Sequence, residues 1–309
     1  MDQNSGPSLI LVKTALDKLL DEATIEMAVV GKATAKDETV FTQDTATNAA
    51  VVSSVIGGGG YFSGTTGDVT PTNDVSVAAA AQKTSLVVQF KKNLPISRTF
   101  MADQQLSAVS KAVRQQALTW GASQDRNAFS AYALGFTTQL TIDGVALFSN
   151  SHVNENGDTV DNLETGALTD PNLNIMINSL RTQLSQTGVI LGYEPKFLLT
   201  PSILHQSGMS VAKSVLRAGG ANNDLNYFSE MYPGMKVVYS PFLDSTSTTA
   251  YFVGSQTHGM YRFEREAFFT DLVDWRTSPN DQYMYKMRAR EEVDSIEYSG
   301  LVGSTGATA

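Results

Sequence analysis

A run of four glycines at 57–60 is the first feature that could do chemistry, because glycine-rich loops bind phosphate through their backbone N–H groups. It stands in VIGGGGYFSGTTGDVTP, residues 55–71. A P-loop also requires Gly-Lys-Ser/Thr after the first glycine, and here the next lysine is Lys83. The dinucleotide-binding spacing fails as well, since Phe62 and Ser63 stand where its last glycine is required. The run is therefore not predicted to bind a nucleotide.

The three histidines, His152, His205 and His258, could hold a metal ion or act as a general base. None has a second histidine at helical spacing, so no ready-made chelating pair exists. Ser151 precedes His152, but adjacency in sequence does not create the geometry of a catalytic serine and histidine, and no G-x-S-x-G motif occurs. We expect structural roles for all three.

Oxygen ligands for calcium are the next possibility, because a calcium loop places them at regular spacing. The segment HVNENG supplies Asn154, Asn156 and Gly157 as such a loop does. The first position is His152 rather than aspartate, and the twelfth is Leu163 rather than glutamate. A polar turn at a loop tip is predicted instead.

Carboxylates in the last third of the chain could form an acid–base pair; they are Glu264, Glu266, Asp271 and Asp274. Scattered charges on an amphipathic β surface are the commoner explanation. No catalytic group, cofactor or metal site is predicted, so the chain is expected not to be an enzyme. A hydrolase with its site in the central part of the chain remains the alternative.

Composition narrows the class of protein. The chain has 309 residues and no cysteine, which excludes disulfides and thiolate zinc sites. Its net charge of -9 argues against an electrostatic nucleic-acid binder. Charged residues make up only 17%, against the roughly 25% usual in soluble domains, and such a surface suits extensive contact with other proteins. No signal peptide or membrane span is predicted, so we expect a soluble protein made in a cytoplasm.

The N-terminal part of the chain divides into zones. A short amphipathic helix is predicted within residues 8–30, and a polar extended arm over 31–53. Residues 57–74 read as turns and a loop, and residues 75–90 as a long strand that returns from it. An excursion of this size without a core of its own indicates function or a partner surface.

The strongest helix signal follows, with Pro95 and Ser97 as its start and Asp103 as a second cap before the main run. Apolar residues recur there at three- and four-residue steps: Leu106, Val109, Val113, Ala117 and Trp120. The pattern continues to Gly135, which predicts a helix of roughly 45 Å.

Residues 136–270 read as an α/β unit. Asp170 is expected to cap a helix whose first turn holds Pro171, and SILHQSGMSVAKSVL is a second helix. Buried strands are predicted in PKFLLTP, MKVVYSP and TAYFVG. The C-terminal part predicts a long hairpin, with Tyr283, Tyr285 and Met287 on one face and Lys286, Arg288 and Arg290 on the other.

Four stretches in this order resemble the major capsid proteins of tailed bacteriophages with the Hong Kong 97-type fold, particularly the Mu-like and related group. The stretches are LPISRTFMADQQLSAVSKAVRQQALTWGASQDRNAFSAYALGFTT, LTIDGVALFSNSHVNENGDTVDNLETGALT, NNDLNYFSEMYPGMKVVYSPFLD and YMYKMRAREEVDSIEYSGLVGS. The likeness covers nearly the whole chain. None of the four is a catalytic motif.

The resemblance implies an α+β fold with an N-terminal arm, an extended β-hairpin loop (E-loop), a peripheral domain with a long spine helix, and an axial α/β domain. The implied boundaries are 1–50 for the arm along a neighbouring subunit, 51–96 for the E-loop, 97–139 for the spine helix, 140–262 for the axial domain and 263–309 for the returning peripheral strands.

The function that the resemblance implies is assembly of hexamers and pentamers into an icosahedral shell around double-stranded DNA. Portal, scaffolding and decoration proteins would be partners, no membrane is involved, and the protein would be found in the virion after assembly in the bacterial cytoplasm. Some relatives cross-link their loops through a lysine; Lys83, Lys91 and Lys92 lie near the loop, but no motif selects a partner, so cross-linking is not expected. An encapsulin-like nanocompartment shell is the alternative.

Within this family the glycine run is interpreted as an assembly hinge in the E-loop, because glycine tolerates positive φ and different loop tilts. Two aromatic rings would anchor the bend against a neighbour. The residues assigned to the hinge are Gly57, Gly58, Gly59, Gly60, Tyr61 and Phe62.

Overall fold

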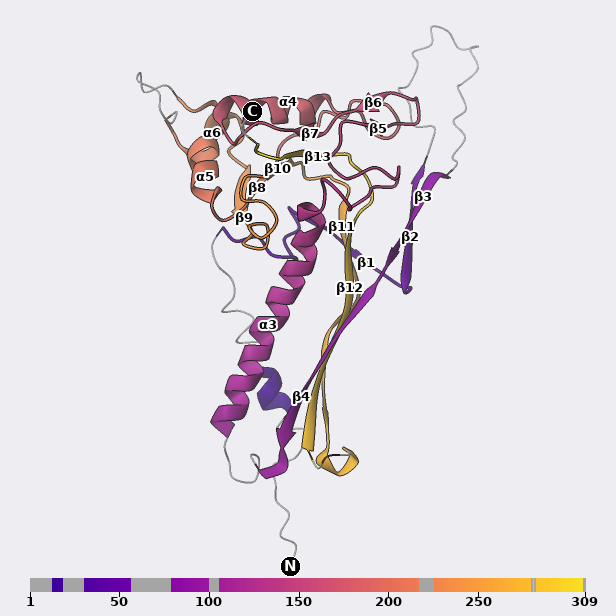
Figure 1. The fold of residues 1–309 in the computed structure, drawn as a ribbon, viewed down its shortest axis with the longest axis vertical. Coiled ribbons are helices and arrows are strands. Elements are labelled where there is room, and N and C mark those ends of the chain that lie inside the picture. Colours follow the sequence, from indigo (N-terminus) through magenta and orange to yellow (C-terminus); the bar gives the residue numbers. More distant parts are fainter. Residues whose placement is uncertain are drawn as a thin grey trace, which may run out of the picture.

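Two β-sheets and one long helix organise the chain (Figure 1). The computed structural model describes residues 13–18, 31–56, 79–99, 106–216, 225–278, 280 and 282–307. The long helix and a sheet of long strands run down a narrow limb, and a second sheet with shorter helices forms the broad upper body (Figure 1).

The helical elements are α3 (Leu106–Ala133), α4 (Asp170–Thr182), α5 (His205–Lys213), α6 (Tyr227–Met231) and the 3-10 turn η1 (Trp275–Thr277). Residues 13–18 are also helical. The strands are β1 (Thr42–Thr45), β2 (Ala50–Ile56), β3 (Ala79–Leu86), β4 (Val88–Ser97), β5 (His152–Val153), β6 (Thr159–Val160), β7 (Leu163–Glu164), β8 (Phe197–Thr200), β9 (Lys236–Tyr239), β10 (Tyr251–Gly254), β11 (Met260–Val273), β12 (Gln282–Ser295) and β13 (Leu301–Ser304).

The limb contains a four-stranded sheet in the order β1-β11-β12-β4. Strands β11 and β12 form the predicted long antiparallel hairpin, and β4 pairs antiparallel with β12. Side chains alternate along β12, so that Tyr285 and Met287 are buried while Lys286 and Arg288 are exposed. This confirms the two faces predicted from the sequence.

Helix α3 is the predicted long helix, and its 28 residues span about 42 Å at 1.5 Å per residue. The apolar stripe packs on the sheet, where Val113 and Ala117 are buried with Leu16, Tyr285 and Met287. Pro95 and Ser97, the predicted start, lie at the end of β4, and residues 98 and 99 directly after them are helical, whereas α3 itself begins at Leu106. Proline is tolerated there since β4 is an edge strand.

The upper body contains a five-stranded sheet in the order β7-β13-β10-β8-β9. Its core is apolar and includes Leu173, Ile177, Leu198 and Val253. The predicted strands and helices of this unit are present, with one correction at α4. Thr169 is its N-cap, without a side-chain cap bond, and Asp170 lies in the first turn.

An aromatic core joins the limb to the upper body. Phe41 packs edge-on against Phe129 and Tyr132, with ring centroids 5.3 and 5.7 Å away. The Tyr132 hydroxyl donates to the Val40 carbonyl at 2.8 Å. Residues 31–46 therefore pack against their own chain, and the course of the arm along a neighbouring subunit stays a prediction.

The predicted loop between residues 51 and 96 has two parts. Strands β2 and β3 form a separate two-stranded hairpin, as expected for a projecting loop. Strand β4 departs from that expectation, because it pairs with β12 along its length and belongs to the limb sheet. The long strand predicted over 75–90 is accordingly divided between β3 and β4, with Val87 between them.

The last strand also corrects the predicted division of the chain. All four residues of β13 are buried, and the strand lies between β7 and β10 in the upper sheet. Residues 263–309 therefore do not all return to the limb. An apolar run such as LVGS is stable where both of its faces are covered, which the centre of the upper sheet provides.

The described residues mix helices with four sheets, of four, five, two and two strands, so the predicted mixture of helix and sheet is confirmed. Within the described parts of the chain, no helix combines the length and the apolar character needed to cross a lipid bilayer.

Candidate functional site

The predicted hinge residues, Gly57 to Gly60 with Tyr61 and Phe62, lie outside the described residues. The hairpin is described up to Ile56 and again from Ala79. The hinge therefore stays a prediction.

His152 has a structural role, as expected. Its ring is fully buried, with Nδ1 2.7 Å from Asp143 Oδ2 and Nε2 3.2 Å from the Leu147 carbonyl oxygen. The ring stacks on Tyr298 at 4.5 Å. Burial acts to raise the pKa of Asp143, but hydrogen bonds from His152 and Thr141 outweigh it and lower that pKa.

His258 and His205 also have no catalytic partner among the described residues. His258 Nε2 lies 3.2 Å from the Thr39 carbonyl oxygen, and its Nδ1 accepts a hydrogen bond from the Met260 N–H at 3.3 Å. Because Nδ1 accepts, the imidazole is neutral. Burial lowers the pKa of His258 to about 4. His205 packs on Tyr239 at 4.7 Å, and burial lowers its pKa too.

The calcium-like segment is a polar turn, as predicted. Asn154 Oδ1 accepts from the N–H groups of Asn156 and Asp158 at 3.0 and 2.8 Å, so this oxygen closes the turn itself. Gly157 has a φ of 84°, which suits glycine in that turn. Over the residues that the structure describes, no three potential ligand side chains gather as a metal site.

The four carboxylates considered for acid–base chemistry do not form a pair. Glu264 binds Arg262 at 2.8 Å, and Glu266 binds Arg288 at 2.5 Å. Asp274 Oδ1 accepts from the backbone N–H of Arg276 at the start of η1. These contacts are structural.

A buried ion pair between β11 and β12 is linked to α3 by a side-chain hydrogen bond. Arg262 contacts Glu291, and both side chains are almost fully buried. Gln124 of α3 donates to the same Glu291 oxygen at 2.9 Å, and Arg262 donates to Gln43 at 2.9 Å. Breaking such a pair leaves an uncompensated buried charge, so this cluster fixes the helix on the sheet.

A second polar cluster holds the β2–β3 hairpin to the limb. Lys83 Nζ of β3 lies 2.5 Å from Asp294 Oδ1 and donates to the carbonyls of Leu140 and Ser295 at 2.6 and 2.7 Å. Ser85 donates to the other Asp294 oxygen at 2.5 Å. We call Lys83, Ser85 and Asp294 the hairpin anchor. From the sequence, Lys83 was considered for cross-linking, which was not expected, and Asp294 could not be identified as its partner because it is 211 residues away.

Glu292 lies beside the hairpin anchor without a full set of hydrogen bonds. Its Oε2 is buried and has no partner among the described residues. Burial, together with the neighbouring charge of Asp294, raises the pKa of Glu292 to about 7. This carboxyl therefore titrates near neutral pH.

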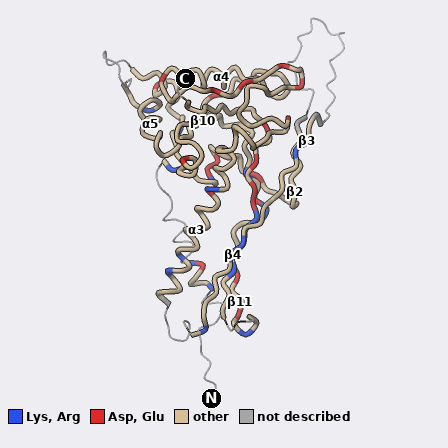
Figure 2. The backbone as a smooth tube through the Cα atoms, viewed as in Figure 1, with Lys and Arg blue, Asp and Glu red and all other residues tan. Residues whose placement is uncertain are grey.

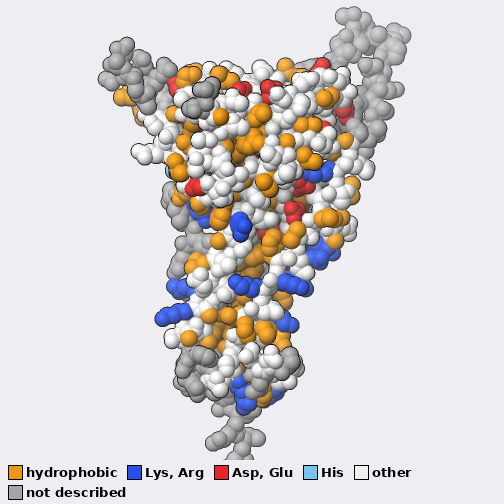
Figure 3. Space-filling model, in the orientation of Figure 1, with side chains coloured by type: hydrophobic (Ala, Val, Ile, Leu, Met, Phe, Trp, Pro, Cys, Tyr) orange, Lys and Arg blue, Asp and Glu red, His pale blue; other side chains and the backbone are white. Residues whose placement is uncertain are grey.

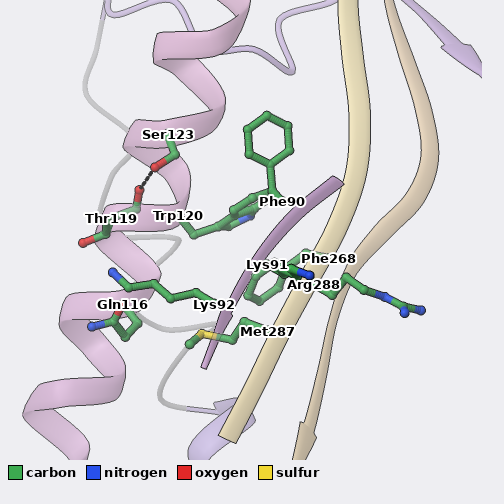
Figure 4. A pocket seen from close by; sticks show the side chains of 10 residues that line it. All are labelled: Phe90, Lys91, Lys92, Gln116, Thr119, Trp120, Ser123, Phe268, Met287 and Arg288. Carbon is green, nitrogen blue, oxygen red and sulfur yellow. Dashed lines mark hydrogen bonds between the residues drawn. The ribbon is translucent and has the colours of Figure 1, made fainter. Parts of the chain in front are cut away.

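A hollow of about 150 Å³ opens between α3 and β4 (Figure 4). Its apolar lining is Phe90, Trp120, Phe268 and Met287. Trp120 stacks on Phe268 at 5.0 Å and meets Phe90 edge-on at 5.9 Å. We call this feature the α3–β4 groove; the sequence identified Trp120 as part of the helix stripe but not the aromatic partners that reach it from two strands.

The polar groups of the groove are amide, hydroxyl and cationic. Gln116 Oε1 is buried there and has no hydrogen-bond partner among the described residues. Lys91 and Lys92 of β4 are exposed at its rim. The guanidinium of Arg288 points away from the hollow (Figure 4), and its Nε donates to Glu266 at 2.9 Å.

Charge is unevenly distributed over the molecule. Lysine and arginine lie mostly along the limb, whereas aspartate and glutamate lie along the top of the upper body and on the limb strands β11 and β12 (Figure 2). The space-filling view shows several cations across the limb beside α3 and β4 (Figure 3). A chain with net charge -9 thus presents a basic limb.

Comparison with protein families gives one match, to a model described as phage capsid protein, over residues 81–307. A search of curated proteins gave no significant match.

Solved structures share the fold at low sequence identity. A virus-like particle from Pyrococcus furiosus matches with a TM-score of 0.53 and 9% identity, covering 94% of this chain and 98% of that chain. The protein of Microbacterium phage Oxtober96 matches at 0.53 and 12%, covering 92% and 90%. The capsid of Myoviridae phage XM1 matches at 0.51 and 13%, covering 91% and 94%.

These structural matches concern the fold alone. The family match, in contrast, covers most of β3, the limb from β4 onward and the upper body. The chain therefore belongs to the phage capsid protein family.

Proposed function

We propose that this major capsid protein builds the head of a tailed bacteriophage in the Hong Kong 97-type fold of the Mu-like group. The family match over residues 81–307 carries the proposal. Hexamers and pentamers of the chain would close into an icosahedral shell around double-stranded DNA. The role is structural and not enzymatic, in keeping with polar clusters that hold elements together.

The proposed parts follow the predicted boundaries with three changes. Residues 51–86 supply the E-loop, 97–139 the spine helix, and 140–262 the axial domain, whereas β4 belongs to the limb sheet because it pairs with β12. Strand β13 joins the axial sheet, since it pairs there with β10. Residues 31–46 are the inner end of the arm and pack in their own subunit.

Surface features support a chain that works among copies of itself. Strand β4 has an open edge in the described sheet, and an open edge is a liability unless another chain covers it. Large apolar side chains are exposed around α5 and α6: Ile203, Met209, Val215, Leu225 and Tyr227. We propose contacts between copies there, a portal and scaffolding or decoration proteins as further partners, and a virion location after assembly in the bacterial cytoplasm.

The glycine run 57–60 is proposed as a hinge of the E-loop. Its support is its position in the sequence, between the two strands of the hairpin. Glycine there would let the loop tilt differently in hexamers and pentamers.

An encapsulin-like nanocompartment is the second candidate, because a virus-like particle from Pyrococcus furiosus shares the fold. Negative-stain microscopy of the purified protein, with analysis of particle contents, separates the two. Shells or capsomers, with DNA-filled heads in infected cells, are expected. Shells filled with an enzyme would favour the nanocompartment, and a compact monomer with turnover would refute both.

A further inference from the structure

The α3–β4 groove has three features that a bound peptide would satisfy together. Its hollow of about 150 Å³ suits one large apolar side chain, since an apolar cavity of roughly this volume takes up benzene. Gln116 Oε1 is a buried acceptor without a donor among the described residues. The groove also borders β4, which is the edge of the limb sheet and pairs only with β12 among the described strands. All three features favour an extended segment that carries an apolar side chain.

The free edge of β4 determines the shape of the partner. Every second residue of an edge strand directs its N–H and C=O groups away from the sheet, where a further strand can pair with them. Side chains of the added strand would alternate between the two faces of the sheet. One apolar side chain would enter the hollow on the α3 face, and its two neighbours in the peptide would lie on the opposite face.

The rim of the groove selects for negative charge. Lys91 and Lys92 are exposed there, and neither forms an ion pair with another described residue. Figure 4 shows Lys92 extending from β4 toward Gln116 of α3, so the preceding residue, Lys91, belongs to the opposite face. Arg288 adds no net charge, because it is paired with Glu266. Among the described residues that line the groove there is no carboxylate, so carboxylates on either face of an added strand would meet a lysine.

The chain's own long strands are poor candidates for this position. Strands β2 and β3 pair with each other and carry no carboxylate. Strand β11 pairs with β12, and two of its three carboxylates, Glu264 and Glu266, are already paired with arginines. Adding such a strand to β4 of a second copy would also join two folded surfaces, whereas a free segment of another protein can fit the edge and the hollow alone.

We propose that the α3–β4 groove binds an extended, acidic peptide segment of another protein, which adds a strand to the edge of β4 and places one large apolar side chain in the hollow. The inference goes beyond the proposed function and does not depend on it, because the groove belongs to a single subunit. Main-chain hydrogen bonds along β4 would supply affinity, while the hollow and the two lysines would supply specificity.

Nucleic acid explains fewer of the observations. Phosphates would bind Lys91 and Lys92, but they would leave the apolar hollow and the edge of β4 unused. The aromatic face of Trp120 is already stacked on Phe268, so it is not a free platform for a base.

Fluorescence of Trp120 reports whether the groove is occupied. The chain has two tryptophans, so Trp275→Phe leaves Trp120 as the only one. The end-capped synthetic peptide TDEFEDT has a phenylalanine between carboxylates and is expected to change the Trp120 emission as it binds. Two control peptides should bind about tenfold or more weakly: TDEAEDT, which lacks the large apolar side chain, and TKKFKKT, which reverses the charge.

Charge reversal in the chain gives the matched test. Lys91→Glu with Lys92→Glu should weaken the binding of TDEFEDT about tenfold or more, and this double variant should bind TKKFKKT instead, because the charges are then complementary again. Lys36→Glu is the control, since Lys36 is exposed and lies outside the groove, and it should bind both peptides as the unsubstituted chain does. Circular dichroism checks that each variant folds.

N-methylation of the peptide separates strand addition from a purely electrostatic contact. In an added strand every second N–H faces β4, so methylating one alternate set of nitrogens should abolish binding, and methylating the other set should not. Equal binding of TDEFEDT and TDEAEDT, or no binding of TDEFEDT at millimolar concentration, would overturn the proposal.

Two further results would assign the groove to another partner and so overturn the proposal. Tighter binding of oligothymidylate than of TDEFEDT would indicate nucleic acid. Self-association in sedimentation that the double lysine variant loses, in a chain that binds no peptide, would indicate a second copy. Peptide binding by a chain that never forms shells would refute the proposed function and leave this inference standing.

Discussion

Glu292 is the side chain whose ionisation should most affect the stability of the subunit. Its pKa of about 7 in the folded chain lies above the ordinary value of 4.5. Between these two values the folded state holds a proton that the unfolded state has lost, so the free energy of unfolding decreases as pH rises through this window. Above pH 7 the folded chain carries the unfavourable charge.

Glu292→Gln should therefore stabilise the unassembled subunit at pH 8, on the order of 1 kcal/mol after allowance for solvent screening. The difference should shrink to a small fraction of this at pH 5, which lies close to the ordinary value of 4.5 and well below the folded pKa of about 7. Urea unfolding at both pH values measures it, with Glu230→Gln as the exposed control. Equal stability of Glu292→Gln and wild type at pH 8 would contradict the assignment. His258 destabilises all three proteins equally as pH falls below 6.5, because its pKa is lowered to about 4.

Residue identities predicted some of these roles but not the partners. The spacing of the histidines excluded a metal chelate, and the structure gives His152 and His258 hydrogen bonds within the fold. The acceptor of His258 is 219 residues away, a separation that no local pattern reveals. The partners of Lys83 and Glu291 could not be identified from the sequence either, because they are 211 and 167 residues away.

At the scale of elements, the hairpin anchor should control how firmly β2–β3 is held to the limb. Lys83→Met keeps most of the side-chain length but removes the charge that joins Asp294 to two carbonyls. The hairpin should open more easily, by on the order of 2 kcal/mol, because Asp294 is left mostly buried without its cation.

Hydrogen exchange measures this opening. In Lys83→Met, amides of β2 and β3 should exchange faster while those of α3 and β12 stay unchanged. Lys91→Met is the control, since Lys91 is exposed and lies outside the hairpin anchor. Unchanged exchange in the hairpin would show that other contacts hold it.

Elements with a strong period were predictable, and elements defined by their neighbours were not. The apolar period of α3 and the alternation of β12 matched the structure because one face of each element is buried. Pro95 marks the end of an edge strand, which also accepts proline, and helical residues begin only after Ser97. The place of β13 was missed because its partners β10 and β7 come from distant segments.

At the scale of the whole molecule, the glycine-rich loop should matter for assembly more than for folding. Deleting residues 57–74 is expected to leave a folded subunit that fails to close shells, because the proposed E-loop reaches another copy. Thermal unfolding and microscopy of the same preparation test both halves of this statement. Loss of folding in the deletion would show that the loop belongs to the subunit's own core.

Charge is distributed unevenly over the whole molecule, since the limb is basic although the net charge is -9. From the sequence we expected an acidic surface poor in charge, but not this basic limb. It arises because α3 and β4, which together lack exposed carboxylates, lie side by side there.

Cryo-electron microscopy of particles assembled from the purified chain tests the central claim most directly. The account predicts closed icosahedral shells built from rings of six and of five copies. Every copy should have the same fold, and the limb of each copy should contact a neighbouring copy. A protein that stays monomeric at every concentration and salt condition, or that forms particles without five-fold rings, would contradict it.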